Sequence, residues 1–308
     1  MKHLSRITVA ALAALAALAL TAAVALAATI DGGPRGERLR GTNQADTING
    51  NGGHDRIRAF AGADVVNGGR GHDRVHGGKD DDAIDGGRGR DRLFGEAGAD
   101  SITGNAGNDL IVGGLGDDTL AGDAPNAGDR TSYDRVYGAA GNDTIRGGDS
   151  RDRLHGGDGN DTVAGNGGRD VMAGGTGDDT QDGGAGDDRI FANLGVDETF
   201  GGAGDDDLWA LARKDVTPGP NGELDTVADF LHGGPGNDRF HLRDGEADRV
   251  ECGEGRDVAL LDTVDVIVDA TTENPNGSCE RVRRAAPSPR EAATEEVQQS
   301  PAAEKVTE

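Results

Sequence analysis

Aspartate recurs at every ninth residue over most of this 308-residue chain. In the stretch "GGRGHDRVHGGKDDDAIDGGRGRDRLF" (68–94), each nine-residue unit opens with Gly-Gly and carries an aspartate at its sixth position and an apolar residue at its eighth. Glycine turns expose backbone carbonyl oxygens, and the aspartates add carboxylates at a fixed spacing. Oxygen donors of these two kinds are the ligands of a hard cation.

The sixth-position aspartates form two unbroken runs and one further unit. They are Asp46, Asp55, Asp64, Asp73, Asp82, Asp91, Asp100, Asp109 and Asp118, then Asp134, Asp143, Asp152, Asp161, Asp170, Asp179, Asp188, Asp197 and Asp206, and finally Asp238. In "GGPRGERLR" (32–40) Glu37 takes the aspartate position, and looser units hold Asp248 and Asp257. A period this regular indicates a repeat architecture.

The spacing predicts how these units fold. We expect positions one to six to form a glycine turn without strand structure, and positions seven to nine to form a short strand. Two units make an eighteen-residue coil, and stacked coils place every second aspartate on the same edge, about 4.8 Å apart. Asp55, Asp73, Asp91 and Asp109 then share one edge, and Asp46, Asp64, Asp82, Asp100 and Asp118 share the other. Such carboxylates repel unless cations lie between them, and calcium tolerates irregular oxygen sites better than magnesium does.

The eighth positions predict a thin apolar interior, which two polar residues interrupt. Gln181 and Thr199 are eighteen residues apart, so they stack in consecutive coils and predict a weak, poorly packed patch. Asp80 stands where a glycine is usual, which makes the turn at 77–82 the least secure cation site. The seventh and ninth positions should face outward, because side chains alternate along a strand.

The pattern G-G-x-G-x-D-x-apolar-x resembles the RTX, or hemolysin-type, calcium-binding nonapeptide repeat. The resemblance covers residues 41–209 continuously and 233–260 loosely. It implies an all-β fold, a parallel β-roll (a right-handed β-solenoid) that holds several calcium ions between consecutive turns. Its calcium ligands would be turn carbonyls and the aspartates from Asp46 through Asp118, from Asp134 through Asp206, and Asp238. Asp248 and Asp257 are left out because the glycines around them are incomplete.

The remaining segments predict an exported protein. Residues 1–27 read as a secretory signal peptide cleaved after Ala27, although the apolar run is also long enough for a membrane anchor. In a secreted or extracellular chain, with or without attachment to the cell surface, Cys252 and Cys279 predict a disulfide; two free thiols are the alternative. The expected organisation is repeats at 28–123, an insertion at 124–133, repeats at 134–209, an insertion at 210–232, degenerate repeats with a disulfide-closed cap at 233–284, and a disordered tail at 285–308.

Composition and the outward positions bear on the partner. The net charge of −25 argues against nucleic acid, and 3% aromatic residues are too few for a thick globular core. Arginines gather at the seventh positions of one predicted sheet, including Arg56, Arg74, Arg92 and Arg153. They favour an anionic cell-wall polymer or acidic glycan as partner, whereas the simpler interpretation is charge balance with nearby aspartates.

No catalytic motif stands out, since neither H-E-x-x-H nor G-x-S-x-G occurs. We therefore expect a protein that is not an enzyme. Its role would be structural or adhesive, and it would fold on binding calcium. A polysaccharide-modifying enzyme built on a β-roll and an acidic disordered chain are the alternatives.

Overall fold

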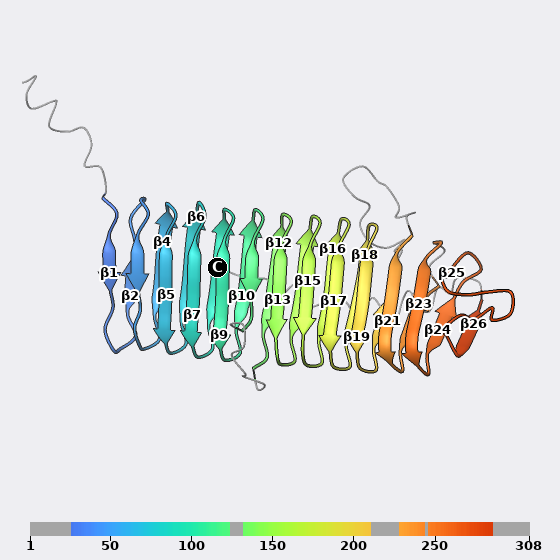
Figure 1. Ribbon diagram of the computed structural model, residues 1–308. Coiled ribbons are helices and arrows are strands. Elements are labelled where there is room, and N and C mark those ends of the chain that lie inside the picture. Colours follow the sequence, from blue (N-terminus) through green and yellow to red (C-terminus); the bar gives the residue numbers. More distant parts are fainter. Residues whose placement is uncertain (1–25, 124–131, 211–227, 244–245, 286–308) are drawn as a thin grey trace, which may run out of the picture.

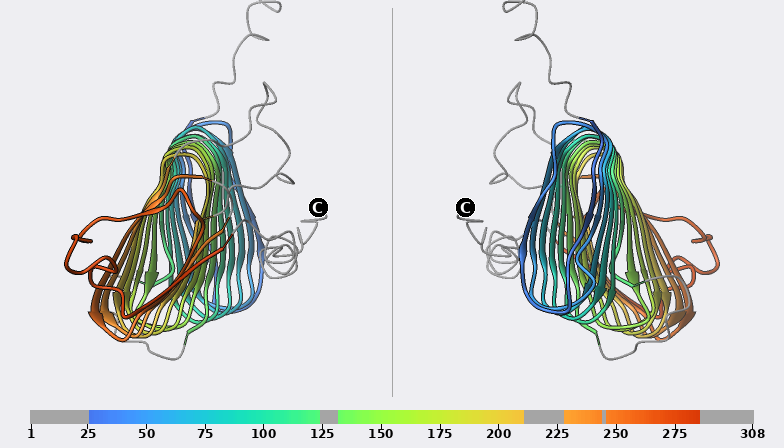
Figure 2. Two further views of the ribbon diagram at one scale, coloured as in Figure 1. Left: turned by 90° about the vertical axis from the view of Figure 1, so that its right-hand side faces the viewer. Right: turned by 90° about the vertical axis from the view of Figure 1, so that its left-hand side faces the viewer.

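The computed structural model describes residues 26–123, 132–210, 228–243 and 246–285. These residues form two parallel sheets of 13 strands each, and consecutive strands alternate between the two sheets. In Figure 1 the coils stack along one axis from β1 to β26, and end-on they superpose as a closed loop (Figure 2). The predicted all-β parallel solenoid is confirmed.

The first sheet contains the odd-numbered strands: β1 (Thr29–Asp31), β3 (Thr47–Asn49), β5 (Val65–Arg70), β7 (Ala83–Arg88), β9 (Ser101–Ala106), β11 (Thr119–Ala121), β13 (Thr144–Gly148), β15 (Thr162–Asn166), β17 (Thr180–Ala185), β19 (Glu198–Ala203), β21 (Phe230–Gly236), β23 (Arg249–Gly255) and β25 (Val266–Ile267). The second sheet contains the even-numbered strands: β2 (Arg38–Arg40), β4 (Arg56–Ala61), β6 (Arg74–Lys79), β8 (Arg92–Ala97), β10 (Leu110–Leu115), β12 (Arg135–Ala140), β14 (Arg153–Asp158), β16 (Val171–Thr176), β18 (Arg189–Leu194), β20 (Asp207–Trp209), β22 (Arg239–Leu242), β24 (Val258–Leu261) and β26 (Arg281–Arg284).

Most strands are twice as long as the sequence predicts, because they run on through the first three positions of the next unit. In β5 and β7 the ladder pairs Gly69 with Gly87 and Arg70 with Arg88. The expectation that glycine-rich positions form no strand is therefore wrong. The ladder continues through these positions whether the paired residue is another glycine, as for Gly69 and Gly87, or a different residue, as for Gly78 and Glu96. The second glycine bends the chain by taking a positive φ, 98° at Gly69 and 97° at Gly87.

The interior is a single file of eighth-position side chains in each sheet. From Ile48 to Ile190 they form one buried apolar cluster, and a second cluster begins at Leu208. Gln181 and Thr199 lie between the two clusters and are fully buried. The Gln181 amide donates to the carbonyl of Phe191 (3.0 Å), and the Thr199 hydroxyl donates to Gln181 Oε1 (3.1 Å). The predicted weak patch is thus a hydrogen-bonded pair, which avoids the cost of burying unpaired polar groups.

Both insertions leave the register of the coils intact. The aspartate-to-aspartate step is 18 residues in most coils, 25 across the first insertion and 32 across the second. Residues 124–131 and 211–227 of the predicted insertions lie outside the described residues. The second predicted insertion also included Asp229–His232, but Phe230 and the residues after it belong to β21. Repeat structure therefore resumes by Phe230, whereas the sequence predicted that it would resume at residue 233.

The C-terminal end contains the predicted disulfide between Cys252 of β23 and Cys279, with a Cα–Cα distance of 5.2 Å. Residues 1–25 of the predicted signal peptide and residues 286–308 of the predicted tail lie outside the described residues. In the part of the chain that the structure describes, no helix meets the length and hydropathy of a membrane span.

Candidate metal centre

The sixth-position aspartates form two hydrogen-bonded columns, one on each edge of the roll. In each step the backbone N–H of one aspartate donates to Oδ1 of the aspartate one coil further on, as from Asp55 to Asp73 and from Asp73 to Asp91 (both 2.7 Å). The Asp55 column is Asp55, Asp73, Asp91, Asp109, Asp134, Asp152, Asp170, Asp188, Asp206, Asp238 and Asp257. The Asp46 column is Asp46, Asp64, Asp82, Asp100, Asp118, Asp143, Asp161, Asp179, Asp197, Asp229 and Asp248. The structure therefore brings together all nineteen aspartates selected from the sequence.

The second carboxyl oxygen of these aspartates is buried without a hydrogen-bond partner through most of both columns. Oδ2 is in this state at Asp55, Asp64, Asp73, Asp82, Asp91, Asp100, Asp109, Asp118, Asp134, Asp143, Asp152, Asp161, Asp170, Asp179, Asp188, Asp206, Asp238 and Asp257. Burying a carboxylate oxygen without a hydrogen-bond donor costs free energy of folding. Because nearly every turn contains such an oxygen, the turns share a need for a partner that the chain does not supply.

Burial raises the pKa of these carboxyls, and the neighbouring carboxylates raise it further, although the N–H bond from the previous coil acts in the opposite direction. The pKa of Asp82 rises to about 7, that of Asp91 to about 8 and that of Asp134 to about 9. Asp170 reaches about 8 and Asp238 about 7 for the same reasons. The columns therefore hold their charge at neutral pH only if positive charge accompanies it.

Backbone carbonyls add further oxygen donors to each turn. A Cβ placed on Gly68 would lie 3.0 Å from Asp73 Oδ2 and 2.6 Å from the carbonyl oxygen of Gly86 in the next coil. At Gly71 (φ 136°) a Cβ would collide with the carbonyl oxygen of Gly53 one coil earlier. Carboxylate and carbonyl oxygens from adjacent coils thus converge in spaces that only glycine leaves open.

This donor set fits calcium. All of the converging groups are oxygens, they come from two successive coils, and they combine anionic with neutral donors, which is the set that calcium takes in proteins. The same positions offer no thiolate or imidazole ligand of the kind that zinc favours. The residues present therefore suit a hard divalent cation, with the column aspartates and the turn carbonyls as its ligands.

The turns that contain Asp80 and Asp46 differ from what the sequence predicts for them. Asp80 adopts the glycine-like conformation of its position (φ 74°), and its carboxylate accepts the N–H of Gly62 (2.9 Å). Asp82 in the same turn keeps the bonds of its column, so the turn at 77–82 retains the geometry of the others. Asp46 instead departs from the pattern, because both of its oxygens accept hydrogen bonds, from Ala28 and Thr42.

Three members of the columns were not among the aspartates predicted from the sequence. Asp229 was assigned to an insertion, and Asp248 and Asp257 were set aside for their incomplete glycines. All three are buried and occupy regular places in the columns. For Asp229 a signal was available, because it precedes Asp238 by nine residues and "DFLH" supplies the apolar residue at the eighth position.

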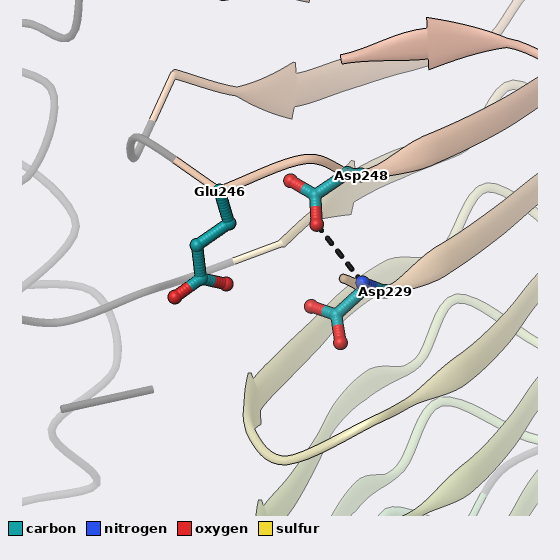
Figure 3. A group of neighbouring side chains, drawn as sticks. All are labelled: Asp229, Glu246 and Asp248. Carbon is teal, nitrogen blue, oxygen red and sulfur yellow. Dashed lines mark hydrogen bonds between the residues drawn. The ribbon is translucent and has the colours of Figure 1, made fainter. Parts of the chain in front are cut away.

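Glu246 adds a carboxylate that no periodicity could reveal. One ligand atom each from Asp229, Glu246 and Asp248 lies within 4.8 Å of the others, and all three residues are buried. Figure 3 shows the Glu246 side chain extending from the turn before β23 beside the two column aspartates. The coil here is 19 residues long, so its turn has one extra residue. Glu246 therefore adds a third carboxylate to the two column aspartates at this point.

Comparison with known families agrees with this geometry. A family model, the RTX calcium-binding nonapeptide repeat in four copies, matches residues 31–59, 58–93, 85–120, 137–172, 146–181, 173–208 and 228–246. Because these matches cover more than half of the chain, the chain belongs to this family. Repeats of the family bind calcium, and proteins that carry them are typically secreted. A comparison with curated proteins gives no match.

Replacing a column aspartate should weaken calcium binding more than replacing an exposed aspartate of the same coil. Asp179→Asn keeps an oxygen that can accept the Asp161 N–H but removes the charge, whereas Asp182 is exposed on β17. We expect D179N to move the calcium midpoint roughly tenfold higher, about 1.4 kcal/mol, and D182N to leave it within twofold. The midpoint is read by circular dichroism. Equal shifts in the two variants would contradict the ligand assignment.

Acid should substitute in part for calcium. Because the folded pKa of most column aspartates lies above the ordinary value of 3.8, the metal-free fold binds more protons than the unfolded chain between about pH 4 and pH 7. Its free energy of unfolding therefore falls as pH rises through this window. The lowered pKa values of Asp46 and Asp187 have the opposite effect on stability, but they act mainly below about pH 4 and so outside this window.

The measurement is urea unfolding in chelator at about pH 5 and about pH 7.5. We expect the higher midpoint at pH 5, and we expect calcium addition at pH 7 to release protons into a weakly buffered solution. A chelated chain that becomes more stable as pH rises would rule out buried protonated columns.

Proposed function

We propose that this chain is an exported calcium-binding β-roll that folds when its turns are occupied by calcium, and that it serves as a structural or adhesive element outside the cell. The observation that carries the proposal is the pair of columns of buried carboxylate oxygens without hydrogen-bond partners. In the metal-free chain these groups must be protonated or must repel one another. A bound calcium ion would supply the positive charge that allows them to ionise inside the fold.

Coupling of folding to calcium follows from where the ligands lie in the sequence. Each turn takes its oxygens from coils that are 18 or more residues apart, so an unfolded chain has no preformed site. Binding free energy is then also folding free energy. The apolar interior is only one side chain wide per sheet, which leaves calcium as the larger source of stability at neutral pH.

Export is supported by the leader-like segment at residues 1–27 and by the Cys252–Cys279 disulfide, which is typical of oxidising compartments. A dilute calcium supply inside cells and a plentiful one outside would keep the chain unfolded until after export. A structural role is supported by the repeated, nearly identical turns, which give no pair of groups the different environments that acid–base catalysis needs.

The test is a calcium titration of the mature chain followed by far-UV circular dichroism, with ion stoichiometry measured on the same samples. We expect a transition from disordered to β-rich chain, several bound ions per chain, and reversal by chelator. Magnesium at the same concentration serves as the control cation and should give little β structure. A β spectrum that survives excess chelator at neutral pH would overturn the proposal, and turnover of uronic-acid polymers would favour the enzyme alternative.

One face of the roll supports a more specific adhesive role. Arg38, Arg56, Arg74 and Arg92 occupy paired positions on β2, β4, β6 and β8, so they form a row along the second sheet. None of these four forms an ion pair within 4.0 Å in the described chain, although charge balance with nearby aspartates was the simpler interpretation of the sequence. Aromatic rings lie beside the row, with Arg74 over the Phe94 ring at 5.5 Å.

We therefore place an anionic polymer, a cell-wall polymer or acidic glycan, on this face. Guanidinium groups spaced by one strand suit repeated carboxylate or phosphate groups. The triple variant Arg56→Gln, Arg74→Gln and Arg92→Gln should weaken binding to an acidic polysaccharide at least tenfold in saturating calcium. The charge-matched control replaces Arg70, Arg88 and Arg146, which lie on the first sheet, and should change binding less than threefold. Equal losses would show that net charge alone governs binding.

A further inference from the structure

The Asp46 column begins at a residue that is not an aspartate. Ala28 holds the position one coil before Asp46, and its backbone nitrogen donates to Asp46 Oδ1 at 2.5 Å. Its carbonyl oxygen accepts the N–H of Thr47 (2.8 Å), and β1 begins at the next residue. Ala28 thus makes the bond of every later member of the column but contributes no carboxylate to it.

Both carboxylate oxygens of Asp46 accept hydrogen bonds from the chain itself. Besides Ala28, the N–H of Thr42 donates to Oδ2 (2.5 Å) and the Thr42 hydroxyl donates to Oδ1 (3.1 Å). Burial acts to raise the pKa of Asp46, but these bonds outweigh it and hold the pKa below its ordinary value. The chain itself therefore supplies donors to both oxygens of Asp46, whereas Oδ2 of Asp82 and Oδ2 of Asp118 further along the column are buried without a hydrogen-bond partner.

The sequence places a processing site next to this residue. "ALA" at 25–27 has the small-residue pattern of a leader peptidase site, and Ala28 is the residue that follows it. Leu26 on the leader side is 80% exposed, so the fold gives it no apolar surroundings. Hydrolysis of the Ala27–Ala28 peptide bond consumes one water and leaves a carboxylate on Ala27 and an amine on Ala28, which is mostly protonated at neutral pH.

We propose that processing after Ala27 creates an α-ammonium group on Ala28 that pairs with the buried carboxylate of Asp46, and that this ion pair ends the Asp46 column in place of a calcium ion. The precursor already has the N–H bond, so cleavage adds the charge rather than the contact. The precursor bond joins a neutral donor to the carboxylate, and the new positive charge adds Coulomb attraction to that contact. The inference rests on the proposed export of the chain and removes Asp46 from the set of calcium ligands.

The first experiment identifies the mature N-terminus. The full-length precursor is expressed in a host that exports it, and the secreted protein is analysed by intact mass and N-terminal sequencing. We expect a chain that starts at Ala28. A start at any other residue overturns the proposal without touching calcium binding by the other turns, while a correctly processed chain that binds no calcium would overturn only the proposed function.

The second experiment isolates the charge. Selective acetylation of the α-amine keeps an N–H donor on Ala28 but removes its charge, and the amide of Thr47 reports locally on the end of the roll through its bond to Ala28. In saturating calcium we expect acetylation to speed hydrogen exchange of the Thr47 amide at least fivefold. In Asp46→Asn the same acetylation should change exchange less than twofold, because the carboxylate partner is gone.

Asp31→Asn is the matched control, because Asp31 is an exposed carboxylate on β1 in the same coil as Ala28 and lies outside the two columns. This variant should keep the full response to acetylation. An equal response in the Asp46→Asn and Asp31→Asn chains, or no response in the unsubstituted chain, would overturn the ion pair.

Discussion

The structure depends on carboxylate oxygens that are buried and not satisfied by the chain. Most coils bring an aspartate to each edge of the roll, and one oxygen of that aspartate accepts a backbone N–H from the coil before. The other oxygen faces into the turn beside glycine carbonyls. Without positive charge the two columns must take up protons, as the raised pKa of Asp134 illustrates. Under the proposed function, bound cations would supply this positive charge and so contribute to the stability of the fold.

The same arrangement explains why the roll tolerates insertions. Successive coils are joined at their aspartates, where the step from Asp109 to Asp134 spans 25 residues and that from Asp206 to Asp238 spans 32. The bonds on either side remain those of the ordinary coils, since the contact depends on the turn and not on the chain between turns. Closing a longer loop adds little entropy cost, because this cost grows only slowly with length.

Polar groups inside the roll are satisfied in two different ways. The Gln181–Thr199 pair uses partners from the protein, so it interrupts the apolar file without leaving an open donor or acceptor. Most column aspartates use the protein for one oxygen, while the other is buried without a hydrogen-bond partner. Asp46 marks the boundary between these cases, since Ala28 and Thr42 supply all of its donors. Thr42 stands where most units have their second glycine, so both the sequence of this unit and its place at the end of the stack set Asp46 apart from the other column aspartates.

Much of the fold and of the site could be predicted from the sequence, because a period of nine leaves few ways to stack. The period indicated the parallel sheets, the alternation of edges and the identity of nearly all the column aspartates. It also contained Asp229, which was overlooked within an apparent insertion. Glu246 has no periodic partner, so its place beside Asp229 and Asp248 depends on an extra residue in one turn. Phe191 and Trp209 occupy ninth positions, which should face outward, yet they are only 3% and 7% exposed. Their burial was not evident from the sequence, because the stacking of the two rings depends on the spacing of neighbouring strands.

The sequence by itself determined the repeat, the donor chemistry and the preference for a hard cation, since these follow from residue type and spacing. Only the tertiary structure decided which oxygen of each aspartate is used by the chain and which remains for a ligand. It also decided that glycine positions continue the strands, and that Ala28 meets Asp46. These outcomes depend on distances between coils, which arise only when residues 18 or more apart are stacked against one another.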